Sequence, residues 1–211
     1  MILIPSDPRE DVIDLLCHVE CLQEDEDMIA SRIEELGVCD EVIIVKIPDN
    51  RLALNVLFPY KIMGMRGAIV PEVLCSGFLI GMRKRLGEGG AKAFLYLIGI
   101  EVGKELYSFI KTVLGDLDLI QTLEIIFHIA RALGISRLRS IRSQNSAIIL
   151  ELLDNLESAV LKRRYSSPQC HLTKGLLTGV LQESTKKRWE VNEVECIAMG
   201  SESCTFILER S

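Results

Sequence analysis

The order in which helix-like and strand-like patterns follow one another constrains the fold of this chain most strongly. Between residues 71 and 208, apolar positions with helical spacing dominate the first half, and short strand patterns then come in pairs. The helical patterns cover residues 71–86, 91–114, 118–133 and 168–182. The strand patterns cover residues 135–141, 147–153, 188–197 and 204–208. Grouped helices and paired strands predict an α+β fold, in which an antiparallel sheet packs against several helices.

The first fifty residues form a small N-terminal α/β unit of unknown role in this interpretation, and residues 51–211 form the main domain. A strand over residues 51–58 is expected to open the main domain. Within the small unit, the patterns predict two helices and one strand, over residues 7–19, 28–36 and 41–47.

Composition narrows the classes of function. Hydrophobic residues make up 48% of the chain and charged residues 26%, so a packed core is expected. The net charge of -6 argues against direct nucleic-acid binding, which depends on neutralising phosphates. No apolar run approaches the roughly 18 residues that span a bilayer, and the start of the sequence lacks the features of a signal peptide. We therefore expect a cytoplasmic protein without a membrane partner.

Motifs for catalysis are missing from the sequence pattern. The glycine-rich run at residues 87–90 follows a helix and lacks the GK[ST] of a phosphate loop. No Ser-His-Asp or Cys-His arrangement can be assigned. Two glycine pairs, Gly99 with Gly103 and Gly175 with Gly179, are four apart on helices and predict close helix packing. The sequence favours a binding protein over an enzyme and leaves the question open.

The strongest chemical signal is a set of cysteines near the C-terminus. Seven cysteines in a chain expected in the cytoplasm favour metal or redox chemistry over disulfides. Cys170 begins the fourth helix, which is expected to lower the pKa of its thiol. Glu193 and Cys196 lie on one strand, and Cys204 opens the next. Three thiolates and one carboxylate suit a tetrahedral zinc ion.

The spacing of two of these residues requires a departure from regular structure. Glu193 and Cys196 are three residues apart and point to opposite faces of a regular strand, so a shared site requires a β-bulge or a twisted strand end. Three unrelated buried or redox-active cysteines are the alternative to a metal site.

The segment from Cys170 to Gly179, CHLTKGLLTG, is followed by the EVEC of residues 193–196 and then by Cys204. This pattern resembles the 4-vinyl reductase domain, in which a Cys precedes a Gly-x-x-x-Gly helix, an E-x-E-C follows, and a further Cys comes eight residues later. The run Asn155-Leu156-Glu157-Ser158 is similar to the family's N-x-E-A strand end. Earlier landmarks at residues 65–67 and 99–103 also resemble the family, so the resemblance covers roughly residues 51–208.

This resemblance implies zinc ligands at Cys170, Glu193, Cys196 and Cys204. The domain occurs in archaeal hydrocarbon-binding proteins, in phenol-responsive bacterial activators as their sensor, and in a bacteriochlorophyll-synthesis protein. Its fold is shared with heme-based nitric-oxide sensors and TRAPP subunits, and such domains usually dimerise around an apolar pocket. The activators carry an aromatic residue where this chain has Leu156, so phenol sensing itself is not implied.

Residues and resemblance together predict a zinc-binding domain that binds or senses a small apolar molecule, such as a hydrocarbon, in a regulatory role. Two alternatives stay open. One is a cysteine-based redox sensor, and the other is an enzyme or assembly factor that handles a tetrapyrrole.

An apolar ligand pocket is expected between the sheet and the helices of the main domain. His128 lies among isoleucines, which predicts a buried position and makes it the candidate polar anchor of the pocket. The predicted lining residues are Leu97, Val102, Phe127, His128 and Leu156.

A homodimer is also expected. The helices over residues 71–82 and 91–114 carry more apolar surface than one small sheet can cover. Phe78, Leu79 and Ile98 are the candidate contact residues.

Overall fold

The structure, a computed structural model of the chain, describes residues 2–5, 13–16, 26–39, 42, 61–62, 65–68, 70–144, 146–161 and 165–210. The chain divides into two compact units, an N-terminal unit of residues 1–69 and a C-terminal unit of residues 70–211. The predicted boundary between residues 50 and 51 lies outside the described residues. The strand predicted over residues 51–58 also lies outside them, as does the strand predicted over 41–47 apart from residue 42.

The N-terminal unit contains two short antiparallel pairs and one helix. Strand β1 (Ile2–Pro5) pairs with β2 (Ile13–Leu16), and β3 (Lys61–Ile62) pairs with β4 (Met65–Arg66). Helix α1 (Glu26–Glu34) confirms the helix predicted over residues 28–36. The helix predicted over residues 7–19 is wrong at residues 13–16, because backbone pairing with β1 overrides the local helical pattern.

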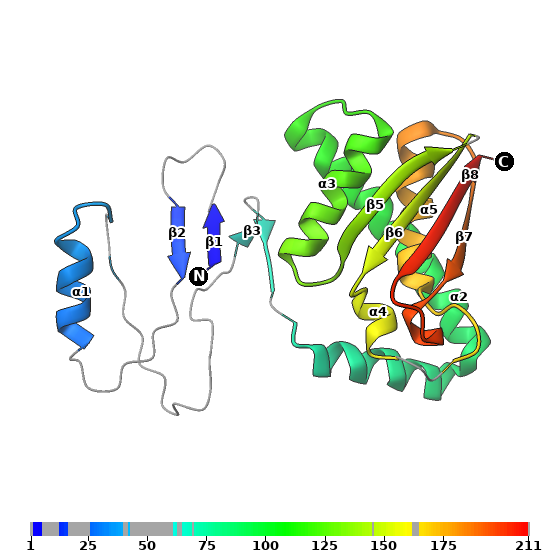
Figure 1. Cartoon of the computed structure of the whole chain (residues 1–211), viewed down its shortest axis with the longest axis horizontal. Helices are drawn as coiled ribbons and strands as arrows, with labels where there is room; N and C mark the ends of the chain where they lie inside the picture. Colours follow the sequence, from blue (N-terminus) through cyan, green and yellow to red (C-terminus); the bar gives the residue numbers. More distant parts are fainter. Residues whose placement is uncertain are drawn as a thin grey trace. The chain divides into compact units, whose positions relative to one another are not determined.

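The C-terminal unit is built on an antiparallel sheet whose strands lie in the order β5-β6-β8-β7 (Figure 1). The strands are β5 (Arg137–Gln144), β6 (Ala147–Leu153), β7 (Trp189–Glu195) and β8 (Cys204–Arg210). Alternate residues of β6 and β8, such as Leu150 and Phe206, are fully buried. They share one core with side chains of the helices, which confirms the predicted α+β fold.

Helix α2 (Glu72–Leu114) contains both of the first two predicted helices. Its backbone leaves the helical region at Gly87, with φ 69° and ψ 170°, where the sequence predicted an end to the first of them. Such a φ favours glycine, so the break is placed at the residue that accommodates it with least strain. The second segment then continues to Gly115, which ends it.

Helix α3 (Leu119–Ala132) matches the prediction over residues 118–133. Asp118 caps it, since its side chain accepts from the Gln121 amide at 2.9 Å while the Gln121 side chain accepts from the Asp118 amide at 3.2 Å. The buried face of the helix carries Ile126 and Phe127. The expectation that His128 is buried is wrong, because the 100° step per residue turns it out of that face and leaves it exposed.

Helix α5 (His171–Thr185) packs directly against α2 through the two predicted glycine pairs. A Cβ added at Gly175 would lie 2.1 Å from the Tyr96 carbonyl oxygen, and one at Gly103 would lie 2.2 Å from the Leu176 carbonyl oxygen. Both distances are far shorter than any real Cβ contact. The prediction of close helix packing is therefore confirmed, and this packing fixes α5 relative to α2.

Candidate metal centre

The structure brings together the four residues that the sequence singled out. One ligand atom from each of Cys170, Glu193, Cys196 and Cys204 lies within 4.8 Å of the others. The Cys170 Sγ is 3.4 Å from the Cys204 Sγ and 3.8 Å from the Cys196 Sγ. All three cysteines are fully buried. This arrangement offers three sulfur atoms and one carboxylate oxygen to a single ion.

The turn between β7 and β8 places two of the cysteines at one end of the sheet. Cys196 follows β7 in an extended conformation and precedes a short 3₁₀ turn, η1 (Ile197–Met199). Its carbonyl oxygen accepts from the backbone of Met199 at 3.0 Å and of Ser201 at 3.2 Å. Gly200 ends η1 with φ 106°, a conformation that favours glycine, and the chain then enters β8 at Cys204.

A register shift in β7 solves the problem of the three-residue spacing. Glu193 lies opposite Phe206 and Glu195 lies opposite Thr205, so two steps on β7 match one step on β8. The extra residue at this bulge allows Glu193 and Cys196 to approach the same site. The predicted bulge is confirmed.

The Glu193 carboxylate has one satisfied and one unsatisfied oxygen. Its Oε2 accepts from the Cys170 amide at 3.0 Å. Its Oε1 is buried and has no hydrogen-bond partner among the described residues. Burial is the main reason that the pKa of this carboxyl group is raised to about 8. A buried carboxylate oxygen without a donor is the feature expected of a ligand that bonds a cation.

The thiols influence one another electrostatically. Burial raises the pKa of Cys170 well above its ordinary value, contrary to the lowering predicted from its helix position. The pKa of Cys196 is lowered, because hydrogen bonds from the Cys170 and Cys204 thiols stabilise its thiolate. In the metal-free chain, the helix N-terminus therefore matters less to Cys170 than burial does. A bound cation would favour the thiolate form of all three.

A short helix, α4 (Leu156–Ala159), supports the cysteines, and the sequence analysis missed it. Asn155 caps α4, and its amide nitrogen donates to the Cys170 Sγ at 3.4 Å. The Ser158 hydroxyl lies 3.1 Å from the Cys204 Sγ. Residues 155–158 were predicted as a strand end, whereas an Asn followed by a Glu two residues later also fits a helix cap and first turn.

Two carboxylates satisfy the N-terminus of α5. Buried Glu157 accepts from the Leu172 amide at 2.8 Å and from the Thr173 amide at 2.9 Å. Burial raises the pKa of Glu157 to about 7, even though these hydrogen bonds act in the opposite direction. Together with the Glu193 bond to the Cys170 amide, this contact fixes the start of the helix that carries Cys170.

Arg83 holds the segment that leads into Cys170. This buried residue of α2 donates from its guanidinium to the Gln169 carbonyl oxygen at 3.3 Å and to the Leu79 carbonyl oxygen at 3.2 Å. The guanidinium also lies 5.8 Å from the centre of the Tyr165 ring. Its partners lie up to 86 residues away in the sequence, so no local pattern could have identified it.

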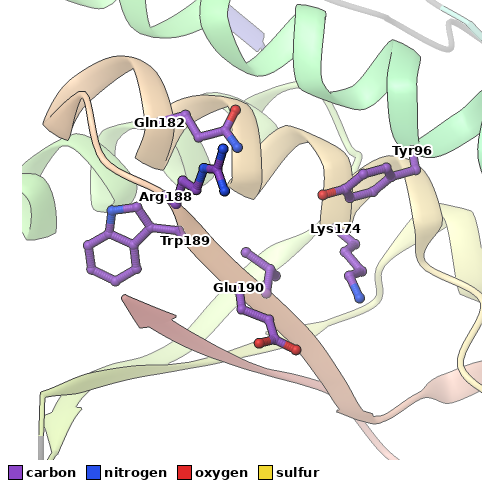
Figure 2. Close-up of a pocket in the computed structure, with 7 residues that line it drawn as sticks. Tyr96, Lys174, Gln182, Arg188, Trp189 and Glu190 are labelled. Carbon is purple, nitrogen blue, oxygen red and sulfur yellow. The ribbon is translucent and has the colours of Figure 1, made fainter. Parts of the chain in front are cut away.

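The predicted ligand-pocket residues are not gathered around one cavity. Leu97 and Val102 are 61% and 44% exposed, and His128 is also exposed. Phe127 is buried in the core and Leu156 is half-buried. A cavity of about 330 Å³ lies elsewhere, between α2, α5 and β7 (Figure 2). Its lining residues are Tyr96, Lys174, Gln182, Arg188, Trp189, Glu190 and Val191.

Within the part of the chain that the structure describes, no helix is both long enough and apolar enough to span a membrane.

Comparison with solved structures defines the class of fold. The phenol-responsive sensory domain of the transcription activator PoxR, solved with phenol, superposes with a TM-score of 0.60 at 18% identity, over 71% of this chain and 79% of that one. A vinyl-4-reductase family protein from Methanocaldococcus jannaschii gives 0.50 at 22% identity, over 69% and 84%. An H-NOX protein from S. oneidensis gives 0.52 at 15% identity, over 88% and 94%. The C-terminal unit thus has the fold of this group of α+β domains.

Sequence comparison narrows the class to one domain family. Residues 154–210 match the family model of the vinyl-4-reductase domain, which confirms the resemblance to the 4-vinyl reductase family, and this stretch holds all four residues of the cluster. Two uncharacterised proteins of M. jannaschii are each 25% identical to this chain over 68% of its length. The chain spans 53% of the first relative and 78% of the second.

Proposed function

We propose that this chain is a zinc-binding regulatory domain that senses a small molecule. The observation that carries the zinc site is the buried, unpartnered Oε1 of Glu193 beside three buried cysteines. An unsatisfied buried oxygen costs about 1–3 kcal/mol or more. A cation bonded to the carboxylate and three thiolates removes that cost, and this donor set suits zinc. The sensing role is supported by the match to the vinyl-4-reductase domain and by a fold shared with a sensory domain.

The proposed zinc has a structural role. Four protein ligands complete a tetrahedron, which leaves no open position for a substrate. The ion would tie the β7–β8 turn, through Cys196 and Cys204, to the start of α5 at Cys170. The large apolar core does not depend on it, so a chelator should loosen this end of the sheet before the whole unit unfolds.

Metal analysis with matched cysteine variants tests the site. We expect one zinc per chain in the purified protein, and a loss of most of it in Cys196→Ser, since one thiolate ligand is gone. Cys75→Ser is the control, because Cys75 is a free, half-buried cysteine of α2 outside the cluster, and its variant should keep the metal. Zinc well below one per chain in the wild type, or equal zinc in both variants, would contradict the proposal.

We also propose a cytoplasmic location and a homodimer. All the cysteines among the described residues are free thiols, as expected in a reducing compartment. Large apolar side chains of α2 are exposed, including Phe78 at 58% and Ile98 at 44%. A second copy of the chain packed on this face would bury them. Leu79, the third predicted contact, is 6% exposed and belongs to the core of its own chain.

A redox sensor is a second candidate, favoured by the spacing of the sulfur atoms. Cys170 lies within 3.4–3.8 Å of the other two cysteines, so little movement separates it from a disulfide. Hydrogen peroxide would accept two electrons and two protons from a thiol pair, forming one disulfide and two waters and releasing the metal. Release of zinc by one equivalent of peroxide, reversed by dithiothreitol and zinc, supports this role. Zinc retained under that treatment argues against it.

A further inference from the structure

The cavity between α2, α5 and β7 is built from residues that the zinc proposal does not use. Tyr96 comes from α2, Lys174 and Gln182 come from α5, and residues 188–191 come from the start of β7 and the residue before it. Its volume of about 330 Å³ lies at the lower end of the range for small-molecule sites. The lining is largely polar, in contrast to the apolar pocket that the sequence predicted.

Two cations of this cavity are unpaired within the described part of the chain. Lys174 and Arg188 make no side-chain hydrogen bond or ion pair with any residue that the structure describes. In Figure 2 the Arg188 guanidinium lies beside Gln182, and the Tyr96 hydroxyl and Lys174 lie across the cavity from them. Donor groups from three elements therefore surround one space.

The other polar groups of the lining are already occupied. The Glu190 Oε1 accepts from the Asn192 side chain at 3.0 Å, and the Trp189 indole N–H donates to the Thr185 hydroxyl at 2.8 Å. The Tyr96 hydroxyl lies 3.4 Å from the Thr178 hydroxyl. One carboxylate faces two cations, so the lining carries an excess of positive charge.

The surroundings increase that excess. Partial burial, followed by the nearby Lys92 ammonium, lowers the pKa of Lys174, while Glu190 and Glu193 act in the opposite direction. Two ammonium groups that repel one another gain when an anion lies between or beside them. A guanidinium also binds two oxygens of a carboxylate or phosphate at once.

We propose that this cavity binds a small oxyanion, a carboxylate or a phosphate, through Arg188 and Lys174. A cationic ligand is disfavoured because it would meet two like charges and one carboxylate that is already hydrogen-bonded to Asn192. The inference rests on the proposed function only in that a sensor needs a ligand, since binding here involves none of the four cluster residues.

The lone tryptophan of the chain makes a direct experiment available. Trp189 lines the cavity, so its fluorescence reports occupancy without competing signals. The zinc-loaded full chain is titrated with inorganic phosphate, with benzoate, and with the uncharged analogue benzamide, each up to roughly 10 mM, which saturates a site of millimolar Kd. We expect saturable binding of phosphate or benzoate, with the successful ion identifying the class, and no binding of benzamide.

Charge variants show whether the binding belongs to this cavity. Arg188→Gln and Lys174→Gln should each weaken binding by about tenfold or more. Lys187→Gln is the matched control, because Lys187 is an exposed neighbour that does not line the cavity, and it should bind like the wild type. Circular dichroism and zinc content confirm that each variant is folded and separate a failure here from a failure of the zinc site.

Three results would overturn the proposal. The first is no saturable response to either anion, and the second is a benzamide affinity equal to that of benzoate. The third is equal affinity in Arg188→Gln, Lys174→Gln and Lys187→Gln, which would show binding outside the cavity.

Discussion

Substituting Gly179 with alanine tests how closely α2 and α5 must pack. A Cβ at Gly179 would lie 2.1 Å from the carbonyl oxygen of Ile100 on α2, roughly 0.9 Å inside the shortest approach that real Cβ atoms make. The obstacle is backbone rather than the end of a flexible side chain, so the helices themselves must separate. Gly179 is also nine positions beyond Cys170 in the sequence, which limits the direct effect on the cysteine cluster.

We expect this overpacking to cost about 3 kcal/mol, at the upper end of the range for an added methyl group in a packed core. For a unit of this size, that loss lowers the Tm by about 10 °C. Denaturant unfolding of the zinc-loaded protein, followed by circular dichroism, measures the change directly.

Gly81→Ala in α2 is the control, because a Cβ there meets nothing within 4 Å. It should leave the protein as stable or raise its unfolding free energy by about 0.5–1 kcal/mol, since alanine favours helix more than glycine does. A Gly179→Ala protein as stable as Gly81→Ala would refute the reasoning, and would show that the two helices do not depend on this close approach.

Two further predictions follow from the exposed helix face and from the buried carboxyls. Phe78→Glu combined with Leu97→Glu should convert the proposed dimer to a monomer in multi-angle light scattering, while a wild-type monomer at micromolar concentration would reject the dimer. The pKa values of Glu157 and Glu193 are raised to about 7 and about 8 from an ordinary value of 4.5, so the folded metal-free chain binds their protons more tightly than the unfolded chain. Its unfolding free energy should therefore fall as the pH rises from about 4.5 to 8, measured by denaturant titration with a chelator present. The zinc-loaded protein should instead lose stability towards low pH, because protons compete with the metal for its ligands. Equal pH profiles with and without the chelator would contradict both trends.

Local sequence signals were sufficient for most of the C-terminal unit. The Asp118–Gln121 capping box, the break at Gly87 and the turn at Gly200 are each determined by residues within a few positions of one another. The bulge in β7 was predictable for a different reason. If Glu193 and Cys196 share a site, the two-residue period of a strand forces an extra residue between them.

The failures have a common physical origin in contacts between distant segments. Residues 13–16 form a strand because β1 supplies a partner, although their own pattern fits a helix. Arg83 supports the metal cluster only because the chain returns Gln169 to its side. The polar cavity needs Tyr96 and Arg188, which are far apart in sequence and belong to patterns that looked like core and strand. Side chains that meet only after folding leave no spacing to recognise.

The cysteine cluster and the cavity lie on the same two elements, which gives a physical route from one to the other. Helix α5 carries Cys170 at its start and then Lys174 and Gln182 along its length. Strand β7 carries cavity residue Glu190 and, three positions later, Glu193. An ion that joins Cys170 to Glu193 would hold the start of α5 against β7, and the cavity lies between that same helix and strand. A structural metal here would therefore set the spacing of Lys174 and Arg188, so its loss would change the affinity of the cavity without touching any residue that lines it.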